Sequence, residues 1–236
     1  MGTNSLSAAS EDYLKVIWTA QEWTYAPVTV SALSAHVGNS PSSVSEAVKK
    51  LTAQGLLTHA RYGSITLTEE GTREAVGMVR RHRLIETFLV EYLDYGWDEV
   101  HDEAEHLEHA VSDKMVNALD RRLGYPVRDP HGDPIPTRDG SFPPLAAVRL
   151  SSCEPGSEVA IARVSDTDPE LLRYLAGLGL HLDVQVRVLS RQAYAGTLTV
   201  TANGEQLELG LPAAQSIWVL PATGAAPAGK SGAGAQ

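Results

Sequence analysis

Apolar positions recur at helical spacing through the first half of the chain and alternate with polar positions in the second half. The helical spacing predicts a helix over residues 10–23 and a long helix over 69–95. One or two helices follow over 97–123, divided near Ser112 if there are two. Alternation near the end predicts a small β-barrel with one helix, over 169–180, between two of its strands. The strand segments are 158–164, 184–189, 197–201, 206–209 and 217–220.

Residues 28–67 carry helix, turn, helix and hairpin signals in that order. The second of these helices has Ser40 as its cap and Pro41 at its first position, and it stops at Gly55. The alternating residues that follow, with a turn around Gly63, predict a small hairpin. This order is typical of a winged helix-turn-helix, a DNA-binding motif. An ordinary helical hairpin with a serine-rich cap is the alternative.

The second helix of this motif is expected to present a small, hydroxyl-rich and basic face. Val44, Val48 and Leu51 should face inward, which leaves serines and lysines outside, where they can approach a major groove closely. Between Pro27 and Ser64 there are three basic residues and one acidic residue, so the segment carries a net positive charge. The DNA-contact candidates are Ser40, Pro41, Ser42, Ser43, Ser45, Glu46, Lys49, Lys50 and Arg61.

The sequence from His101 to His109 is rich in metal-binding side chains. On a helix, His101, Glu105, Glu108 and His109 fall within an arc of about 100° and converge on one point. Without a counter-charge these carboxylates repel one another, and a divalent cation removes that repulsion. Nitrogen and oxygen donors without thiolate favour manganese or iron(II). A solvated acidic helix face is the alternative.

A second candidate pair, His82 and Glu86, is spaced i, i+4 on the long amphipathic helix. Such a pair is often a weak surface ion pair. Antiparallel packing could instead bring it beside the 101–109 segment. Asp12 on the first helix is a third donor candidate, or simply an acid that favours the helix dipole.

Composition narrows the class of protein. Hydrophobic residues make up 43% of the 236 residues, which is enough for real cores. Cys153 is the only cysteine, so we expect no disulfide framework and a reducing, cytoplasmic setting. No apolar run approaches the roughly 18 residues that span a bilayer, so no membrane association is expected. The net charge of −10 argues against nucleic acid, although the charge of the contacting face decides that question.

The helices over 97–123 carry more apolar surface than a helical pair can bury, which favours a homodimer. Six of the 13 prolines fall between Gly124 and Pro144 and predict an extended connector. The predicted division is a flexible lead at 1–9, a winged helix-turn-helix domain at 10–73, a helical metal-binding and dimerisation domain at 74–123, a linker at 124–145, the β-barrel at 146–221 and a disordered tail at 222–236.

In this order of parts the chain resembles the diphtheria-toxin-repressor family of bacterial metalloregulators, over about residues 8–220. The resemblance is carried by Ser40-Pro-Ser-Ser-Val44, Arg81-His-Arg-Leu-Ile-Glu86, the 101–109 segment and Pro130-His-Gly-Asp-Pro-Ile-Pro136. It implies an α+β multidomain fold with a Src-homology-3-like barrel. It also implies a non-enzymatic homodimer that binds double-stranded palindromic operator DNA when loaded with metal.

The resemblance further implies two ligand sets. The first is Asp12, Glu105, Glu108 and His109; the second is His82, Glu86 and His101, to which the barrel could add Asp168 or Glu170. Iron-responsive members place methionine and cysteine where this chain has Asp12 and Glu105, whereas manganese-responsive members carry acids. Because oxygen donors suit manganese, we expect a repressor activated by Mn2+, with an Fe2+-responsive repressor as the alternative.

Two other classes of function remain as rivals. Di-iron oxidases use Glu-x-x-His on two helices of a four-helix bundle, and this chain matches only once, at Glu103 to His106. A constitutive DNA-binding protein, whose acidic helices only dimerise, is the second rival. The metal hypothesis instead makes the ion a tether between the DNA-reading part and the dimer scaffold.

Overall fold

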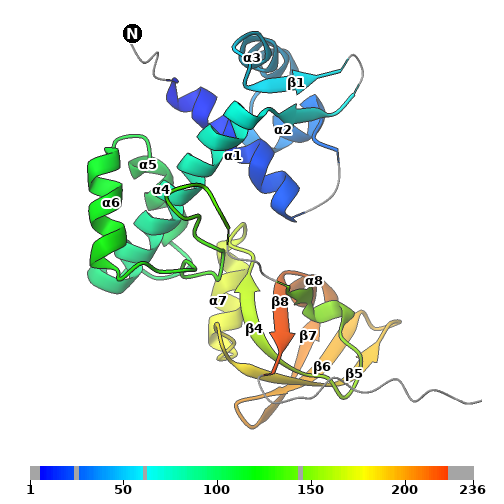
Figure 1. Cartoon of the computed structure of the whole chain (residues 1–236). Coiled ribbons are helices and arrows are strands. Elements are labelled where there is room, and N and C mark those ends of the chain that lie inside the picture. The colour runs from blue at the N-terminus through cyan, green and yellow to red at the C-terminus, as the bar shows by residue number, and fades with distance from the viewer. Residues whose placement is uncertain (1–5, 24–26, 61–62, 143–145, 223–236) are drawn as a thin grey trace, which may run out of the picture. The chain divides into compact units, whose positions relative to one another are not determined.

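The computed structural model describes residues 6–23, 27–60, 63–142 and 146–222, which form two compact units. The first unit contains residues 6–95, 100–129 and 134–142; the second contains 96–99, 130–133 and 146–222. Figure 1 shows a helical first unit and a second unit built around a sheet. Among the described residues, no helix combines the length and apolar character needed to cross a membrane.

The first unit begins with the predicted winged helix-turn-helix. Ser40 accepts a hydrogen bond from a backbone amide and so caps the third helix, as the sequence indicates, and Thr29 caps the second helix in the same way. Leu14 and Ile17 of the first helix belong to the same cluster of buried residues as Val44 and Val48 of the third, so these two helices share one core. The elements are α1 (Ala8–Trp23), α2 (Val30–Val37), α3 (Pro41–Ala53), β1 (Leu57–His59) and β2 (Ile65–Leu67).

Three further helices complete the first unit: α4 (Glu69–Leu93), α5 (Val100–Leu107) and α6 (Asp113–Arg122). Thr68 caps α4 and Ser112 caps α6, so the predicted division near Ser112 is confirmed. Helix α5 ends at Leu107, which places Glu108 and His109 in the turn that follows rather than on the helix. That early end matters for the candidate site.

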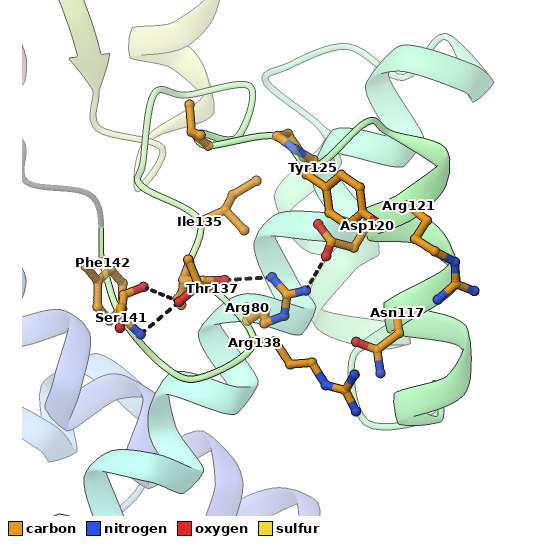
Figure 2. Close-up of a pocket in the computed structure, with 13 residues that line it drawn as sticks. Arg80, Asn117, Asp120, Arg121, Tyr125, Ile135, Thr137, Arg138, Ser141 and Phe142 are labelled. Carbon is orange, nitrogen blue, oxygen red and sulfur yellow. Dashed lines mark hydrogen bonds and ion pairs between the residues drawn. The ribbon is translucent and has the colours of Figure 1, made fainter.

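The proline-rich segment is irregular, as predicted, but it is not a free connector. Ile135 is 2% exposed and packs with Leu84 of α4 and Val116 of α6. The buried Arg80 of α4 donates to the carbonyl of Pro136 at 2.6 Å and pairs with Asp120 at 2.6 Å. Figure 2 shows these contacts at the wall of a cavity of about 600 Å³. Part of the predicted connector is therefore packed on the helices, because Ile135 has apolar surface to bury.

The second unit is a six-stranded antiparallel sheet in the order β3-β8-β4-β5-β6-β7, which confirms the predicted small β domain. Register shifts in β4 and β5 mark bulges, which bend strands around a core. The strands are β3 (Val148–Arg149), β4 (Glu158–Val164), β5 (Gln185–Gln192), β6 (Thr197–Ala202), β7 (Glu205–Gly210) and β8 (Ile217–Pro221). Helix α7 (Pro169–Gly177) matches the predicted helix, whereas η1 (Leu150–Ser152) and α8 (Leu211–Gln215) were not expected.

Candidate metal centre

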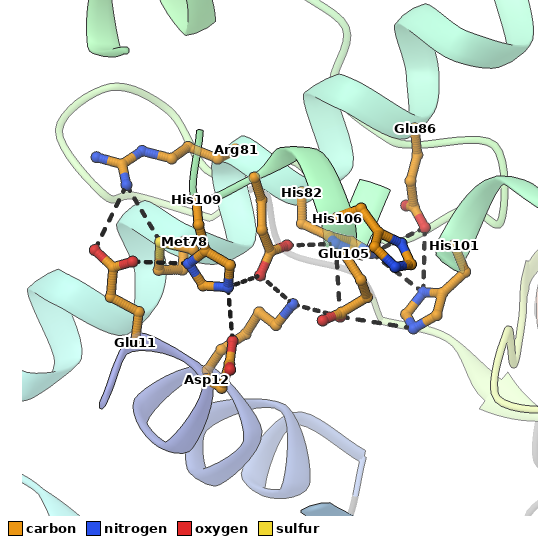
Figure 3. A network of polar contacts seen from close by, with 12 residues as sticks. Glu11, Asp12, Met78, Arg81, His82, Glu86, His101, Glu105, His106 and His109 are labelled. Atoms are coloured by element: carbon orange, nitrogen blue, oxygen red, sulfur yellow. Dashed lines mark hydrogen bonds and ion pairs between the residues drawn. The ribbon is translucent and has the colours of Figure 1, made fainter. Parts of the chain in front are cut away.

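Three elements of the first unit bring histidines and carboxylates together: α1, α4 and α5 with the turn after it. Figure 3 shows Asp12 and Glu11 on α1 reaching toward His109, while Glu86 of α4 and His101 of α5 face each other further along. Short contacts between elements that are distant in sequence therefore show which side chains lie together.

The first group of side chains surrounds His109. Its Nε2 lies 2.8 Å from Asp12 Oδ1 and 3.6 Å from Glu108 Oε1, and its Nδ1 lies 2.8 Å from Glu11 Oε2. Asp12, Glu108 and His109 each offer one ligand atom, and these atoms lie within 4.8 Å of one another. Three of the four residues expected in the first ligand set are therefore together.

The second group is centred on His82 of α4. Its Nε2 lies 2.9 Å from Glu86 Oε1 and 3.2 Å from His101 Nδ1, and Glu86 Oε1 lies 3.3 Å from the same His101 nitrogen. Glu86 is fully buried and His82 is nearly so. The whole second ligand set that the sequence predicts within this unit is thus assembled.

Glu108 connects the two groups. Its Oε2 lies 2.6 Å from His82 Nδ1, while its Oε1 faces His109. The expectation that His101, Glu105, Glu108 and His109 converge on one point was wrong. Because α5 ends at Leu107, His109 turns toward α1, whereas His101 stays beside His82.

Glu105 occupies a position between the two groups. Its Oε1 lies 3.8 Å from His82 Nδ1 and 3.7 Å from His101 Nε2. With His82 and Glu108 it forms a third set of donors whose ligand atoms lie within 4.8 Å of one another. Its assignment to the same ligand set as Asp12 and His109 stays a prediction.

Lys15 of α1, which sequence reasoning missed, supplies a counter-charge to this cluster. Its Nζ lies 2.5 Å from Glu105 Oε1 and 2.5 Å from Glu108 Oε1. Burial disfavours its charged form, but the attraction of Glu108 and Glu105 outweighs burial and raises the pKa of Lys15. The expectation that the metal-free carboxylates simply repel was therefore incomplete.

The two histidines also have shifted pKa values. Burial opposes protonation of His82, yet the charge of Glu86 and the hydrogen bonds to Glu108 and Glu86 raise its pKa to about 9. Burial likewise opposes protonation of His109, but Glu11 and Asp12 raise its pKa above the ordinary value. The neighbouring carboxylates therefore favour the protonated form of both imidazoles, and a bound cation would replace those protons.

The pKa values of Asp12 and Glu108 are shifted in opposite directions. Burial raises the pKa of Asp12 despite the attraction of His109. Burial also opposes ionisation of Glu108, but its hydrogen bond to His82 and the charge of Lys15 hold its pKa below the ordinary value. Glu108 is thus an ionised carboxylate with no exposed surface, held there by two positively charged neighbours.

The donor set fits a divalent cation of borderline or hard character. Carboxylate oxygens and imidazole nitrogens suit Mn2+ and Fe2+, and the single cysteine, Cys153, lies in the other compact unit. The two predicted ligands from the barrel, Asp168 and Glu170, lie at the start of α7. Asp168 caps α7 by accepting from the amide of Glu170 at 2.9 Å, and Glu170 lies in the first turn of that helix. Their role as ligands stays a prediction.

The candidate DNA interface lies on α3. Val44, Val48 and Leu51 are buried as expected, which leaves the opposite face to solvent. Ser40 is the cap of this helix and accepts from the amide of Ser43 at 3.2 Å. The candidates Ser40, Pro41, Ser42, Ser43, Ser45, Glu46, Lys49 and Lys50 are all exposed, and Arg61 lies outside the described residues.

Glu11 is the second residue of the site that sequence reasoning missed. It holds the outer nitrogen of His109 and lies 3.9 Å from Arg81 of α4. A signal for both missed residues was present in the sequence. Glu11 is adjacent to Asp12, and Lys15 is three positions after Asp12, so on a helix it shares a side with that candidate ligand.

Three family models match the chain. The model of the iron dependent repressor, N-terminal DNA binding domain, covers residues 5–65. The model of the iron dependent repressor, metal binding and dimerisation domain, covers residues 68–137. The FeoA domain covers residues 148–221.

Known proteins match over most of the chain. The iron-dependent repressor IdeR of Mycobacterium leprae is 30% identical over 216 residues, which cover 86% of this chain and 92% of that protein. The diphtheria toxin repressor of Corynebacterium efficiens is 27% identical over 210 residues, which cover 85% of this chain and 90% of that protein.

Solved structures match as well. A manganese-dependent transcriptional repressor in complex with manganese has a TM-score of 0.86 and 52% identity, covering 90% of this chain and 99% of that one. The structure of the manganese regulator SloR has a TM-score of 0.75 and 35% identity, and the match covers 90% of this chain and 98% of that one.

The winged motif, the helical scaffold and the histidine–carboxylate cluster define a metal-dependent transcriptional regulator. The chain belongs to the iron-dependent repressor family, whose members are DNA-binding transcriptional repressors. The resemblance expected from the sequence, and the class of fold and function that it implies, are confirmed.

Proposed function

We propose that this chain is a cytoplasmic, manganese-activated repressor that binds palindromic operator DNA as a homodimer and controls metal-homeostasis genes. The 2.8 Å contact between Asp12 Oδ1 and His109 Nε2 carries the proposal. Asp12 belongs to α1, which shares a core with α3 of the winged motif. His109 follows α5, within the part matched by the metal binding and dimerisation model. A ligand set drawn from both parts can couple metal binding to DNA binding.

Two sets of side chains would hold metal. Asp12, Glu105, Glu108 and His109 form the first set, and His82, Glu86 and His101 form the second, with Asp168 and Glu170 as further candidates. When bound, a divalent cation supplies positive charge that balances the carboxylates and holds donors from separate helices together. Glu108 belongs to the first set and also contacts the second, because one of its oxygens faces His109 and the other faces His82.

A hydrogen bond offers a route from this site to the DNA-reading helix. Tyr13 follows Asp12 on α1, and its hydroxyl oxygen accepts from the side-chain amide of Asn39 at 3.2 Å. Asn39 directly precedes Ser40, the cap of α3. A shift of α1 is therefore transmitted to the start of α3. A 100-fold change in the balance between two conformations requires only about 2.7 kcal/mol.

The choice of manganese rests on donor chemistry and on similar structures. Asp12 and Glu105 offer oxygens rather than sulfur, which lessens the disadvantage of Mn2+ against later metals. Two similar solved structures are described as manganese-dependent or manganese regulators. An Fe2+-responsive repressor is the second candidate, because relatives of the chain include proteins named iron-dependent repressors.

The homodimer is supported by apolar side chains on the helical scaffold. Tyr92 and Leu93 near the end of α4 are 40% and 53% exposed, and Met115 of α6 is 49% exposed. Exposed apolar groups on a scaffold matched by a dimerisation model are the type of surface that a second copy covers. The domain boundaries 10–73 and 74–123 stay predictions.

The test begins with selection of the bound sequence from random duplex DNA in the presence of Mn2+. Affinity for the selected duplex is then titrated in parallel against Mn2+, Fe2+ under anaerobic conditions, Zn2+ and Co2+, with a chelator as control. We expect a palindromic site, a dimer on each site and activation at lower free Mn2+ than is needed to saturate a Glu105→Ala variant. DNA binding that persists unchanged in the chelator would overturn the proposal, and stronger activation by Fe2+ would favour the second candidate.

A further inference from the structure

The cavity beside the buried Arg80 lies outside the metal centre and the DNA interface described above. Its lining residues all belong to the first unit, and none of them is a candidate metal ligand or DNA contact. Its volume of about 600 Å³ falls within the range of about 300–1,000 Å³ that is typical of sites for small molecules. The cavity is therefore large enough to hold a small organic molecule.

Much of the cavity wall consists of apolar side chains, several of which are rings. These apolar members are Tyr125, Pro126, Val127, Ile135, Pro136 and Phe142. Tyr125 and Val127 are 64% and 67% exposed, which leaves this wall accessible from solvent. Aromatic side chains favour stacked or edge-on contacts with another ring, so the wall suits a ligand with an aromatic body.

The charged residues that line the cavity are three arginines and one aspartate. Arg80 and Asp120 balance each other, because they pair at 2.6 Å. Arg121 and Arg138 are exposed, and neither has an ion-pair or hydrogen-bond partner among the described residues. Asp139, the acid next to Arg138 in the chain, instead accepts hydrogen bonds from two neighbouring hydroxyl groups. The cavity therefore has two guanidinium groups whose positive charge is not balanced within the described part of the chain.

We propose that this cavity binds a small aromatic carboxylate. The aromatic body packs against Tyr125 and Phe142, and the carboxylate accepts hydrogen bonds from the guanidinium groups of Arg121 and Arg138. Arginine suits this role, because its planar fork of N–H groups matches the two oxygens of a carboxylate. Figure 2 shows Asn117 on the same side of the cavity as both arginines, where its side-chain amide can donate as well. The site uses none of the candidate metal ligands, so the inference is independent of the proposed function.

The test uses naphthaleneacetate as the probe. Naphthaleneacetamide keeps the aromatic body without the charge, and acetate keeps the charge without the body. Binding to the full chain is measured by titration calorimetry in saturating Mn2+ and again after the metal is removed. The cavity variant combines Arg121→Gln with Arg138→Gln. The matched control combines Arg73→Gln with Arg122→Gln, which removes the same two charges from exposed positions outside the cavity.

We expect the unaltered protein to bind naphthaleneacetate about tenfold more tightly than the amide or acetate, with or without Mn2+. The cavity variant should lose about tenfold in affinity for the acid and keep its affinity for the amide, whereas the control variant should bind both as the unaltered protein does. No binding of naphthaleneacetate, equal affinities for acid and amide, equal losses in the two variants, or binding that requires Mn2+ would each overturn the proposal. Probe binding that weakens as the chain dimerises would assign the cavity to a second copy of the chain and would also overturn it.

Discussion

Asp12 and His109 are 97 positions apart in the chain, yet Asp12 Oδ1 and His109 Nε2 lie 2.8 Å apart. The contact joins α1, which packs on the winged motif, to the turn after α5. No local signal predicts this pairing, since an acid near the start of a helix is common and the pattern around His109 does not name a partner on α1. Their pairing makes the site responsive to the arrangement of two parts of the protein.

Replacing Glu108 with alanine should destabilise the metal-free protein strongly. Glu108 is fully buried and contacts both Lys15 and His82, so its removal takes a charged partner from two buried cations. We expect a loss of about 3–5 kcal/mol in the free energy of unfolding, measured by urea denaturation in the presence of a chelator. Glu103→Ala on α5 is the control and should change stability by less than about 0.5 kcal/mol. A similar loss in both variants would contradict the assigned role of Glu108.

The stability of the metal-free protein should fall as the pH rises through the range of His82. The pKa of His82 is about 9 in the folded protein against 6.5 for an ordinary histidine. Its contribution is fully present below pH 6.5 and is lost as the pH rises toward about 9, because the folded state binds the proton more tightly. The raised pKa of His109 acts in the same direction. Urea midpoints at pH 6, 7.5 and 9 measure this slope.

A His82→Gln variant provides the control for that slope, since it removes the group with the raised pKa. Its stability should change less between pH 6.5 and 9 than that of the unaltered protein. Stability that rises over this interval in the unaltered protein would show that the imidazole is not held as a cation. Affinity for Mn2+ should rise with pH over the same interval, because a ligating imidazole must lose its proton.

Glu11→Gln should weaken Mn2+ binding without unfolding the protein. Glu11 Oε2 lies 2.8 Å from Nδ1 of His109, which orients the imidazole and strengthens it as a donor through Nε2. Loss of such a partner weakens metal binding by about 10-fold to 100-fold. Titration calorimetry with Mn2+ measures the change, with Glu103→Gln as the control. Equal affinities in the two variants would remove Glu11 from the site.

Tyr13→Phe should reduce DNA binding while leaving the metal count unchanged. The substitution removes the acceptor for Asn39, a contact worth about 1 kcal/mol, and so loosens the connection between α1 and the start of α3. We expect operator affinity in saturating Mn2+ to fall by about fivefold. Tyr92→Phe is the matched control, because Tyr92 donates to the carbonyl of Arg122 far along the chain from α3. A parallel loss of Mn2+ would show that Tyr13 acts on the site itself.

Lys49→Ala should weaken binding to all duplexes to a similar extent. Lys49 is exposed on α3, opposite the buried Val44 and Val48, where it can reach a phosphate. Losing one phosphate contact lowers the slope of log affinity against log salt concentration by about 1. Mobility shifts over a salt series measure that slope, and Lys114→Ala should leave it unaltered. Loss of sequence preference with an unchanged slope would instead indicate a base contact.

The sequence alone determined the local elements and the candidate ligands. Ser40 before Pro41, Thr68 before the long helix and Ser112 before α6 act through contacts within a few residues, so their signals survive without tertiary information. The spacing of Val44, Val48 and Leu51 likewise gave the buried face of α3. The repeated histidines and carboxylates indicated metal chemistry, because few other patterns need that mixture of donors.

Only the tertiary structure decided how those donors are shared. Helix α5 ends at Leu107, so His101 and His109 join different groups instead of meeting at one point. The contact between Lys15 and Glu108 links residues 93 positions apart, and no local pattern encodes a pairing over such a distance. Ile135 packs against α4 and α6 for the same reason: burial depends on which surfaces meet, and that is a property of the folded chain.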